Sequence, residues 1–447
     1  MQIILIVMLQ AAFGLSEQAP ATGMSFDQLA QTALASNKKL QAAREQLHQA
    51  EARLVQAGLR PNPSLDLSTT TDAIFANEGE TGFAVTLSQP FELGGKRIKR
   101  IHVAEAESEL AKAEIADAER QLIGQLKTAY LQAAETTVRL NFLERTRSVN
   151  QQVAQVMNVR LTAGDASRLD SHLLQAENNR IEAQRLQAES LLTRQLFEIR
   201  KLAGIPPSTV LSVRPPEAAL SSALNEVNLV ELALRSRPDL QAARLREVLA
   251  GAGLDLARSQ AVPNITGMVR YARDANISRF ATATQPRAFE KDSVVEFGVS
   301  IPLPFWNREQ GNIREASSKG SQARAEREAL ELRVRTEVDE AVRRYELAVR
   351  SLEFLRSGVV NETEAGLSIT QLAYRLGDAR LSDVLLQQRS LIEAQMAELS
   401  AQAEIDAANA VLEFAVGVIV LPTSTEIGRS GEFALNPQVE KTGFPIH

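Results

Sequence analysis

Two stretches of the chain, ALASNKKLQAAR at 33–44 and ALRSRPDLQAAR at 233–244, agree at eight of twelve positions. Three further landmarks recur in the same order: Pro61-Asn62 as Pro263-Asn264, FAVTLSQPF (83–91) as FGVSIPLPF (297–305), and Gly164-Asp165-Ala166 as Gly377-Asp378-Ala379. Chance similarity among Ala-rich helices does not explain four ordered matches, because two of them lie in segments without helical character. The sequence therefore predicts an internal two-fold repeat.

Proline placement and apolar spacing predict the helices of each half. No Pro lies within residues 91–205 or 305–421, and apolar residues in both windows recur at steps of three and four. This spacing is typical of amphipathic helices. The sequence predicts short helices at 38–59 and 238–260, long helices at 97–162 and 312–376, and returning helices at 167–203 and 381–417.

Each long helix is predicted to be roughly 100 Å long and to end at a Gly-Asp step. These steps are Gly164-Asp165 and Gly377-Asp378. Gly suits the left-handed position that ends a helix, and Asp suits the N-cap of the next one, so the chain reverses there. The short and returning helices of one half together nearly equal the long helix in length. The sequence thus permits one long helix to lie beside two shorter ones stacked end to end.

Between the short and long helices the apolar period changes to two, which predicts one β-hairpin per half, at about 64–91 and 265–304. Phe83, Val85 and Leu87 share one face of such a strand. Strands of about ten alternating residues suit an outer-membrane barrel whose apolar side chains face lipid. A soluble sheet with one buried face alternates in the same way. Four strands cannot close a membrane barrel, since the smallest have about eight, so a barrel requires an oligomer, such as a trimer.

Composition and charge exclude several classes of protein. The net charge of −6 gives no indication of nucleic-acid binding, and the absence of Cys excludes disulfides and thiolate metal sites. The four His residues are not spaced as metal ligands, and no phosphate-binding loop or nucleophile motif is present. We therefore expect no enzyme activity, no cofactor and no resident metal.

The two ends and the linker complete the expected organisation. Residues 1–21 resemble a secretory signal peptide, with an apolar run at Ile3–Leu15 and a small-x-small step at Ala19–Ala21; a buried helix start is the alternative. Residues 421–447 are expected to be a disordered tail. The predicted units are a first repeat at 22–204, a linker at 205–224 and a second repeat at 225–420.

Two junction motifs carry a resemblance to a known family. QPFELGGKR at 89–97 and SIPLPFWNREQGNI at 300–313 resemble the strand-to-helix junctions of the CzcC-type, heavy-metal branch of TolC-like outer-membrane efflux factors. Pro90 and Pro304 can end strands without donating a ladder hydrogen bond, and Gly94-Gly95 permits a tight turn. Trp306, the only Trp of the chain, belongs with the aromatic residues that a membrane girdle needs.

The resemblance implies a mainly α fold with a small transmembrane β part. It implies a homotrimer whose 12-stranded β-barrel, four strands per chain, sits in outer-membrane lipid on a long α-helical periplasmic barrel. The expected function is a passive export duct for heavy-metal cations of the cobalt, zinc and cadmium class. The expected partners are a periplasmic adaptor (a membrane fusion protein) and an inner-membrane pump of the resistance–nodulation–division (RND) class.

The resemblance also implies a gate at the periplasmic tip. Asp170 and Asp383 match the family's tip positions, and Tyr374 matches a tyrosine that holds the tip shut, with Asp170 as its expected acceptor. The family's companion Arg matches Ala379 here, so Arg380 is the candidate substitute. Carboxylates crowded in a narrow pore attract cations and repel one another. The alternative for both Asp residues is a favourable interaction with a helix N-terminus.

Two other functions remain open from the sequence alone. A multidrug or type I secretion duct would have the same fold, because substrate cannot be deduced from a passive pore. A soluble periplasmic coiled-coil adaptor or scaffold belongs to a different class. An adaptor should carry a Gly-rich β-domain between its helical arms, whereas only hairpins interrupt the helices here.

Overall fold

The computed structural model of the chain describes residues 23–71, 80–163, 167–215, 228–277 and 289–417. The expected signal peptide and the expected tail lie outside the described residues. No helix in the described part of the chain is both long and apolar enough to cross a membrane.

The repeated phrase of the sequence forms a junction between two short helices. In the first repeat α2 (Phe26–Ser36) meets α3 (Lys38–Ala57) at Asn37, and in the second α6 (Leu229–Ser236) meets α7 (Pro238–Gln260) at Arg237. The two junction residues have nearly the same backbone angles, with φ −66° and ψ 118° at Asn37 and φ −69° and ψ 122° at Arg237. The chain therefore makes the same bend twice.

The Arg that ends each copy of the phrase closes this bend. Arg44 donates to the carbonyl of Leu34 at 3.2 Å, and Arg244 donates to the carbonyl of Leu234 at 3.1 Å. Carbonyls in the last turn of a helix lack partners within the helix, so a returning guanidinium stabilises them. The duplicated letters thus specify a duplicated helix junction.

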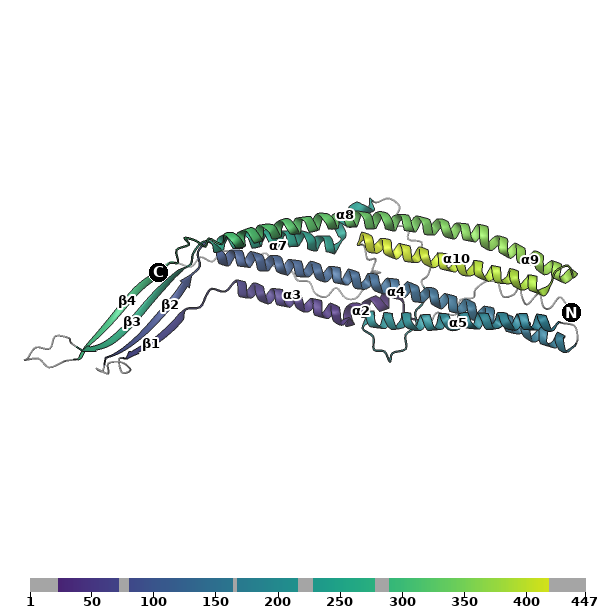
Figure 1. Ribbon diagram of the computed structural model, residues 1–447, viewed down its shortest axis with the longest axis horizontal. Coiled ribbons are helices and arrows are strands. Elements are labelled where there is room, and N and C mark those ends of the chain that lie inside the picture. The colour runs from purple at the N-terminus through teal and green to yellow at the C-terminus, as the bar shows by residue number, and fades with distance from the viewer. Residues whose placement is uncertain (1–22, 72–79, 164–166, 216–227, 278–288, 418–447) are drawn as a thin grey trace, which may run out of the picture.

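Long helices run through most of the molecule (Figure 1). The first repeat contains α4 (Lys96–Thr162) and the returning helix α5 (Arg168–Ala203). The second contains α8 (Gln310–Phe354), η2 (Leu355–Val360), α9 (Asn361–Leu376) and α10 (Leu381–Val416). The expected long helix at 312–376 corresponds to α8, η2 and α9 in direct succession, and η2 is a π-helix with a wider turn.

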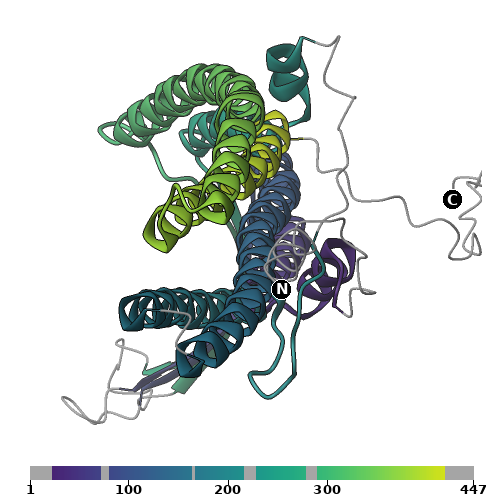
Figure 2. The same cartoon turned by 90° about the vertical axis from the view of Figure 1, so that its right-hand side faces the viewer.

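The long helix of each repeat lies beside shorter helices arranged end to end. Helices α3 and α5 lie along α4, and α7 and α10 lie along α8 and α9, which confirms the stacking that the helix lengths permit (Figure 1). Seen from the end that carries the helix reversals, the α4–α5 pair and the α9–α10 pair form two groups (Figure 2).

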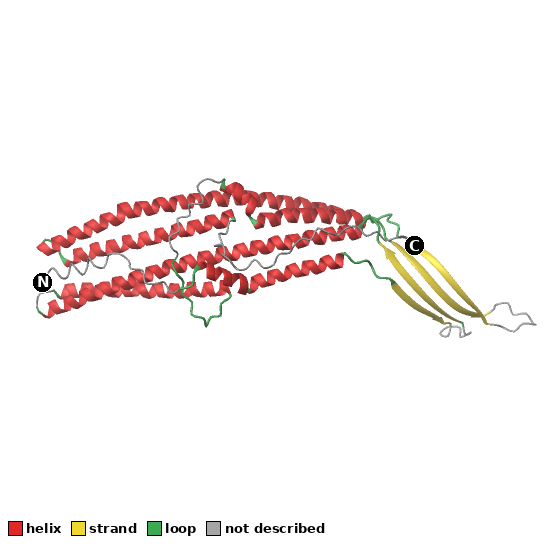
Figure 3. Ribbon diagram, turned by 180° about the vertical axis from the view of Figure 1, so that it is seen from behind, coloured by secondary structure: helices red, strands yellow, loops and turns green. Residues whose placement is uncertain are grey.

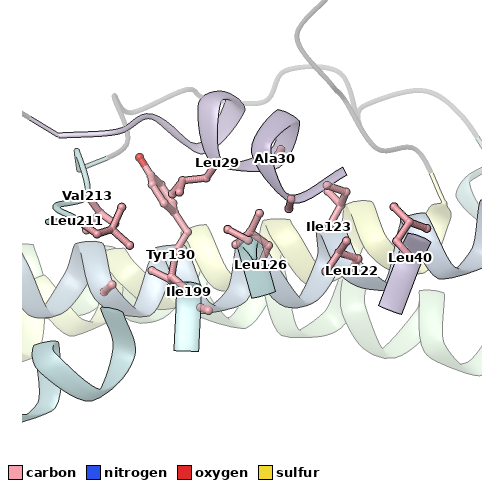
Figure 4. Packing of buried hydrophobic residues seen from close by; sticks show 14 residues of the cluster. Leu29, Ala30, Leu40, Leu122, Ile123, Leu126, Tyr130, Ile199, Leu211 and Val213 are labelled. Atoms are coloured by element: carbon pink, nitrogen blue, oxygen red, sulfur yellow. The ribbon is translucent and has the colours of Figure 1, made fainter. Parts of the chain in front are cut away.

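The largest core cluster lies where α2 crosses the middle of α4 (Figure 4). Leu29, Leu126 and Ile199 are fully buried there. The ring of Tyr130 meets that of Phe26 edge to face at 5.7 Å, and its hydroxyl donates to the carbonyl of Arg214. This cluster joins α2, α4, α5 and the segment around Leu211 and Val213, so it holds the middle of the first repeat together.

The four strands form one antiparallel sheet at the opposite end from the helix reversals (Figure 3). Its order is β1 (Ser64–Thr71), β2 (Thr81–Phe91), β3 (Ile265–Ile277) and β4 (Phe289–Ser300). The expectation that the last strand reaches 304 was wrong, since β4 ends at Ser300. Pro302 follows two residues later and has no N–H to donate to a ladder.

Candidate functional site: the two-faced sheet and the helical tip

One face of the sheet is apolar across all four strands. The pairing aligns Leu65, Leu87, Val269 and Phe297 in one row and Leu67, Val85, Tyr271 and Val295 in the next. Seven of these eight side chains are exposed, from 41% for Tyr271 to 80% for Phe297, and Val85 is half-buried. A soluble sheet would bury this face, so its exposure favours contact with lipid.

The opposite face of the sheet is the more polar one, although it also carries Met268 and Val294. One of its rows aligns Asp66, Thr86, Arg270 and Glu296. The guanidinium of Arg270 lies 3.1 Å from the carboxylate of Glu296. An apolar face backed by a polar face is the pattern of a barrel strand with one side toward lipid and the other toward water.

The sheet is open at both edges within one chain. Among the residues that the structure describes, β1 pairs only with β2 and β4 pairs only with β3. Each outer strand therefore presents a row of backbone N–H and C=O groups without a strand partner. Unpaired backbone groups are costly in a hydrocarbon environment, so such edges require another strand.

The strand-to-helix junction of the first repeat is built on two glycines. Gly94 and Gly95 have φ angles of 72° and 68°, in the left-handed region, and Gly95 is the N-cap of α4. A Cβ added at Gly94 would lie 3.0 Å from the Cβ of Val262 and 3.1 Å from the carbonyl of Ser259. Pro90 lies in the last part of β2, beyond its pairing with β1.

The second junction makes the same turn without glycine. Glu309 is the N-cap of α8 and has a φ of 60°, the only positive φ outside glycine among the described residues. Pro304 and Trp306 lie between β4 and α8, and Trp306 is almost fully exposed. An exposed indole beside an apolar strand face suits the interface between hydrocarbon and headgroups.

The basic start of α4 is tied to protein groups. Lys96 donates to the side chain of Asn264 at 2.6 Å, and Arg97 donates to the carbonyl of Gly58 at 2.6 Å. Arg100 pairs with Glu92, whose pKa is lowered mainly by that hydrogen bond. These contacts hold the sheet, α3 and α4 together at the junction.

The helix reversals lie at the far end of the molecule. Gly377 ends α9 with a φ of 88°, the left-handed conformation expected of it, whereas Gly164 and Asp165 lie outside the described residues. The expected N-cap role of Asp378 was wrong, and that of Asp165 falls outside the described residues. The caps are Ser167 and Arg380, because the Ser167 hydroxyl accepts from Leu169 and the Asp383 carboxylate accepts from the N–H of Arg380.

The predicted gate residues lie near this end on three helices. Asp170 is in the first turn of α5 and Asp383 in the first turn of α10, where the Asp383 carboxylate caps the helix at 2.9 Å. Tyr374 packs on a buried cluster that contains Met157 and Leu174. The expected hydrogen bond from Tyr374 to Asp170 is absent from the described part of the chain, because the tyrosine ring packs among apolar side chains instead.

Two links between the repeats in this half of the molecule escaped the sequence analysis. Gln388 of α10 donates to Asn150 of α4 at 3.0 Å, and Arg389 donates to Glu177 of α5 at 2.8 Å. Burial raises the pKa of the Glu177 carboxyl, but hydrogen bonds from Arg180 and Arg389 outweigh it, so the pKa lies below its ordinary value. Helical spacing places these polar residues on buried faces, which is the signal that could have found them.

A buried ionic cluster where α6, α7 and the end of α10 meet was also missed, and we call it the waist cluster. Arg120 of α4 and Arg237 are both nearly fully buried and both contact Asp239. Arg237 also pairs with Glu337 of α8 at 2.6 Å and donates to the carbonyl of Ala415 at 3.0 Å. Arg120 lies 4.3 Å over the ring of Phe414. The cluster ties α4 of the first repeat to α7, α8 and α10 of the second.

A long helical body carrying a sheet with one uncovered apolar face defines a channel protein of the outer membrane. The chain belongs to the outer membrane efflux protein family, which it matches over residues 29–205 and 229–418. It is the outer-membrane channel component of an efflux system, with its helical part in the periplasm, and it is not an enzyme. No group of His, Asp or Glu side chains in the described residues could hold a metal ion.

Individual relatives span most of the chain. The cobalt-zinc-cadmium resistance protein CzcC of Cupriavidus metallidurans is 25% identical over 364 residues, which cover 81% of this chain and 83% of CzcC. The pyoverdine export outer membrane protein OpmQ of Pseudomonas putida is 26% identical over 401 residues, which cover 83% of this chain and 80% of OpmQ. The solved outer-membrane channel OprN superposes with a TM-score of 0.72 at 20% identity, covering 89% of this chain and 91% of that one. This last likeness concerns the fold.

Proposed function

We propose that three copies of this chain close a barrel of twelve strands and work as an export duct. The observation that carries the proposal is the four-stranded sheet, with an exposed apolar face and an unpaired edge on both β1 and β4. Pairing β4 of one protomer with β1 of the next would satisfy both edges at once. Three such pairings close the wall with twelve strands, which lies within the range of membrane barrels.

The proposed cargo is a heavy-metal cation of the cobalt, zinc and cadmium class. The similarity to CzcC and the two junction motifs support this choice. The described residues contain no cluster that would capture a metal, so cations would pass through rather than bind. Selectivity would then lie in the partners, for which we propose an inner-membrane pump of the RND class joined through a periplasmic adaptor.

The helical tip is the proposed gate of the duct. Asp170 and Asp383 occupy equivalent positions in the first turns of α5 and α10. In a trimer they would form two rings of three carboxylates, with Tyr374 and Arg380 beside them, and such rings favour cations. Asp383 already caps its helix, so its proposed role in the ring adds to a structural one.

Deletion of the gene tests the cargo directly. The deletion strain should become sensitive to zinc, cobalt or cadmium, and plasmid-borne protein should restore resistance. A second candidate is export of siderophores or drugs, which the similarity to OpmQ favours. That candidate would be favoured if the deletion strain became sensitive to dyes or antibiotics, or accumulated siderophore, while its metal sensitivity stayed unchanged.

A further inference from the structure

The long helix of the first repeat keeps one buried spacing along its whole length. Helix α4 is α-helical throughout Lys96–Thr162, and buried side chains recur every seven residues. Such regular spacing keeps the same face of a helix against its neighbours over many turns. The buried residues of this row are Leu122, Ala129, Thr136, Leu143, Asn150 and Met157.

The corresponding row in the second repeat slips by one residue. Val338, Tyr345 and Leu352 lie seven residues apart on the inner face of α8, so an unbroken helix would continue the row at 359, 366 and 373. The inner positions beyond η2 are instead Val360, Leu367 and Tyr374. A π-turn holds one residue more than an α-turn, so η2 contains one extra residue.

Helix α9 carries a second, mostly apolar row beside the one it uses. Continuing the spacing of α8 without the extra residue would turn Gly366, Ala373, Ile369 and Leu376 inward, with Glu362 as a charged residue in the first turn of the same face. The first four are apolar or small, yet Ile369 and Leu376 are 68% and 70% exposed in a single copy of the chain. The two rows are one residue apart, which corresponds to a rotation of about 100°.

The surroundings of α9 can accommodate the change. The loop between α9 and α10 covers residues 377–380, one residue fewer than the 163–167 loop of the first repeat, so it can take up one residue. Across Gly366 lies Gln387, whose amide nitrogen would be 2.6 Å from an added Cβ and which donates to the carbonyl of Thr363 at 3.3 Å. Only a flexible side chain opposes rotation there.

We propose that α9 can occupy two registers. In the structure described η2 holds the extra residue, and when the duct opens this residue moves into the loop at 377–380. This inference rests on the proposed gate. The shift replaces Tyr374 by Ala373 against the cluster of Met157, Leu174 and Leu381. A large ring thereby leaves the contact between the two repeats, while α4 and α5 keep their register.

Deletion of Gly358 tests for the extra residue. With Gly358 removed, the spacing of α8 runs directly into Val360, Leu367 and Tyr374, so the protein should still assemble as a heat-sensitive trimer at wild-type level. Deletion of Glu144, which lies as far from the start of α4 as Gly358 lies from the start of α8, is the matched control. That deletion should abolish assembly, because every residue beyond it rotates by about 100°.

Thiol labelling tests the movement, since the chain contains no Cys. In cells that lack the pump and adaptor, Ile369→Cys should react with a maleimide at least fivefold faster than Leu367→Cys. Co-expression of the pump and adaptor should reverse that ratio. In the Gly358-deleted background the ratio should stay fixed, and the protein should assemble without exporting.

Two results would overturn the proposal. If the Gly358 deletion abolishes assembly, just as the Glu144 deletion is expected to do, η2 holds no spare residue. If the Gly358 deletion assembles and exports at the wild-type rate, the register shift is not needed for opening, and the proposed export duct is unaffected. Failure of the intact protein to export metal would contradict only the proposed cargo, because the labelling ratio reports the register without any cargo.

Discussion

Asn37 and Arg237 occupy the same place in the two repeats, yet they hold it with different chemistry. The amide of Asn37 donates to the carbonyl of Leu202 at 2.8 Å, at the end of α5. Arg237 donates to the carbonyl of Ala415, at the equivalent end of α10. The amide is neutral, whereas the guanidinium is a buried charge that needs Asp239 and Glu337 beside it. The second repeat therefore depends on an ionic cluster where the first does not.

Truncation of Arg237 should be strongly destabilising. Arg237→Ala leaves the half-buried Asp239 without its closest partner, and removing one member of a buried pair costs on the order of 3 kcal/mol. The heat-induced dissociation of the trimer on gels should shift to clearly lower temperature. The matched control is Arg246→Ala in α7, because the pair of Arg246 with Glu114 is exposed and should contribute about 0.5 kcal/mol. Equal shifts for the two variants would contradict the account.

The link between Glu177 and Arg389 should weaken in acid. The pKa of Glu177 lies below its ordinary value of 4.5, so its contribution to stability is complete above about pH 4.5. That contribution is lost as the pH falls through the lowered pKa of the folded state. Between pH 5 and pH 2 the wild-type dissociation temperature should therefore fall more than that of Glu177→Gln, which already lacks the charge. Parallel curves would show that this carboxylate has no such role.

At the scale of elements, the turn into each long helix depends on a left-handed residue. Gly95 and Glu309 adopt it at equivalent positions, with φ angles of 68° and 60°. Glu309 bears a strain that glycine avoids. Two hydrogen bonds offset it, because the carboxylate of Glu309 accepts from the amide of Asn312 and its backbone N–H donates to the side chain of Asn307. The backbone geometry is thus kept while the residue differs.

Alanine substitutions at the glycine pair should have unequal effects. Gly95→Ala meets nothing within 4 Å, so it should cost only the left-handed strain of about 1–2 kcal/mol. Gly94→Ala bears the same strain and also presses on the backbone of Ser259. The yield of assembled trimer in outer membranes should fall further for Gly94→Ala. An equal yield would mean that the close approach to Ser259 can relax freely.

Sequence analysis predicted the elements more completely than their contacts. Apolar periods identify the long helices and the hairpins because those periods follow directly from helix and strand geometry. They do not identify η2, since the local composition of Leu355–Val360 is ordinary and only the phase of the buried residues before and after it changes. The cluster of Arg120, Arg237 and Asp239 was missed because Arg120 is far from the other two in sequence and meets them only after the repeats pack.

At the scale of the whole molecule, duplication explains why one chain carries two hairpins and two helical arms. The β2–β3 pairing joins one strand of each repeat, and the waist cluster joins the arms. The outer edges of β1 and β4 have no strand partner among the described residues. The proposed gate residues stay predictions, because their roles depend on neighbouring protomers around the tip.

The central claim is that one face of the sheet contacts lipid and the other lines an aqueous lumen. Single nitroxide labels can be placed on neighbouring residues of opposite faces, at Leu67 and Ser68 in β1 and at Val299 and Ser300 in β4. In outer-membrane vesicles, labels at Leu67 and Val299 should be relaxed by oxygen and shielded from a water-soluble nickel complex. Labels at Ser68 and Ser300 should show the reverse. Nickel access at Leu67 and Val299 equal to that at their neighbours would contradict the account.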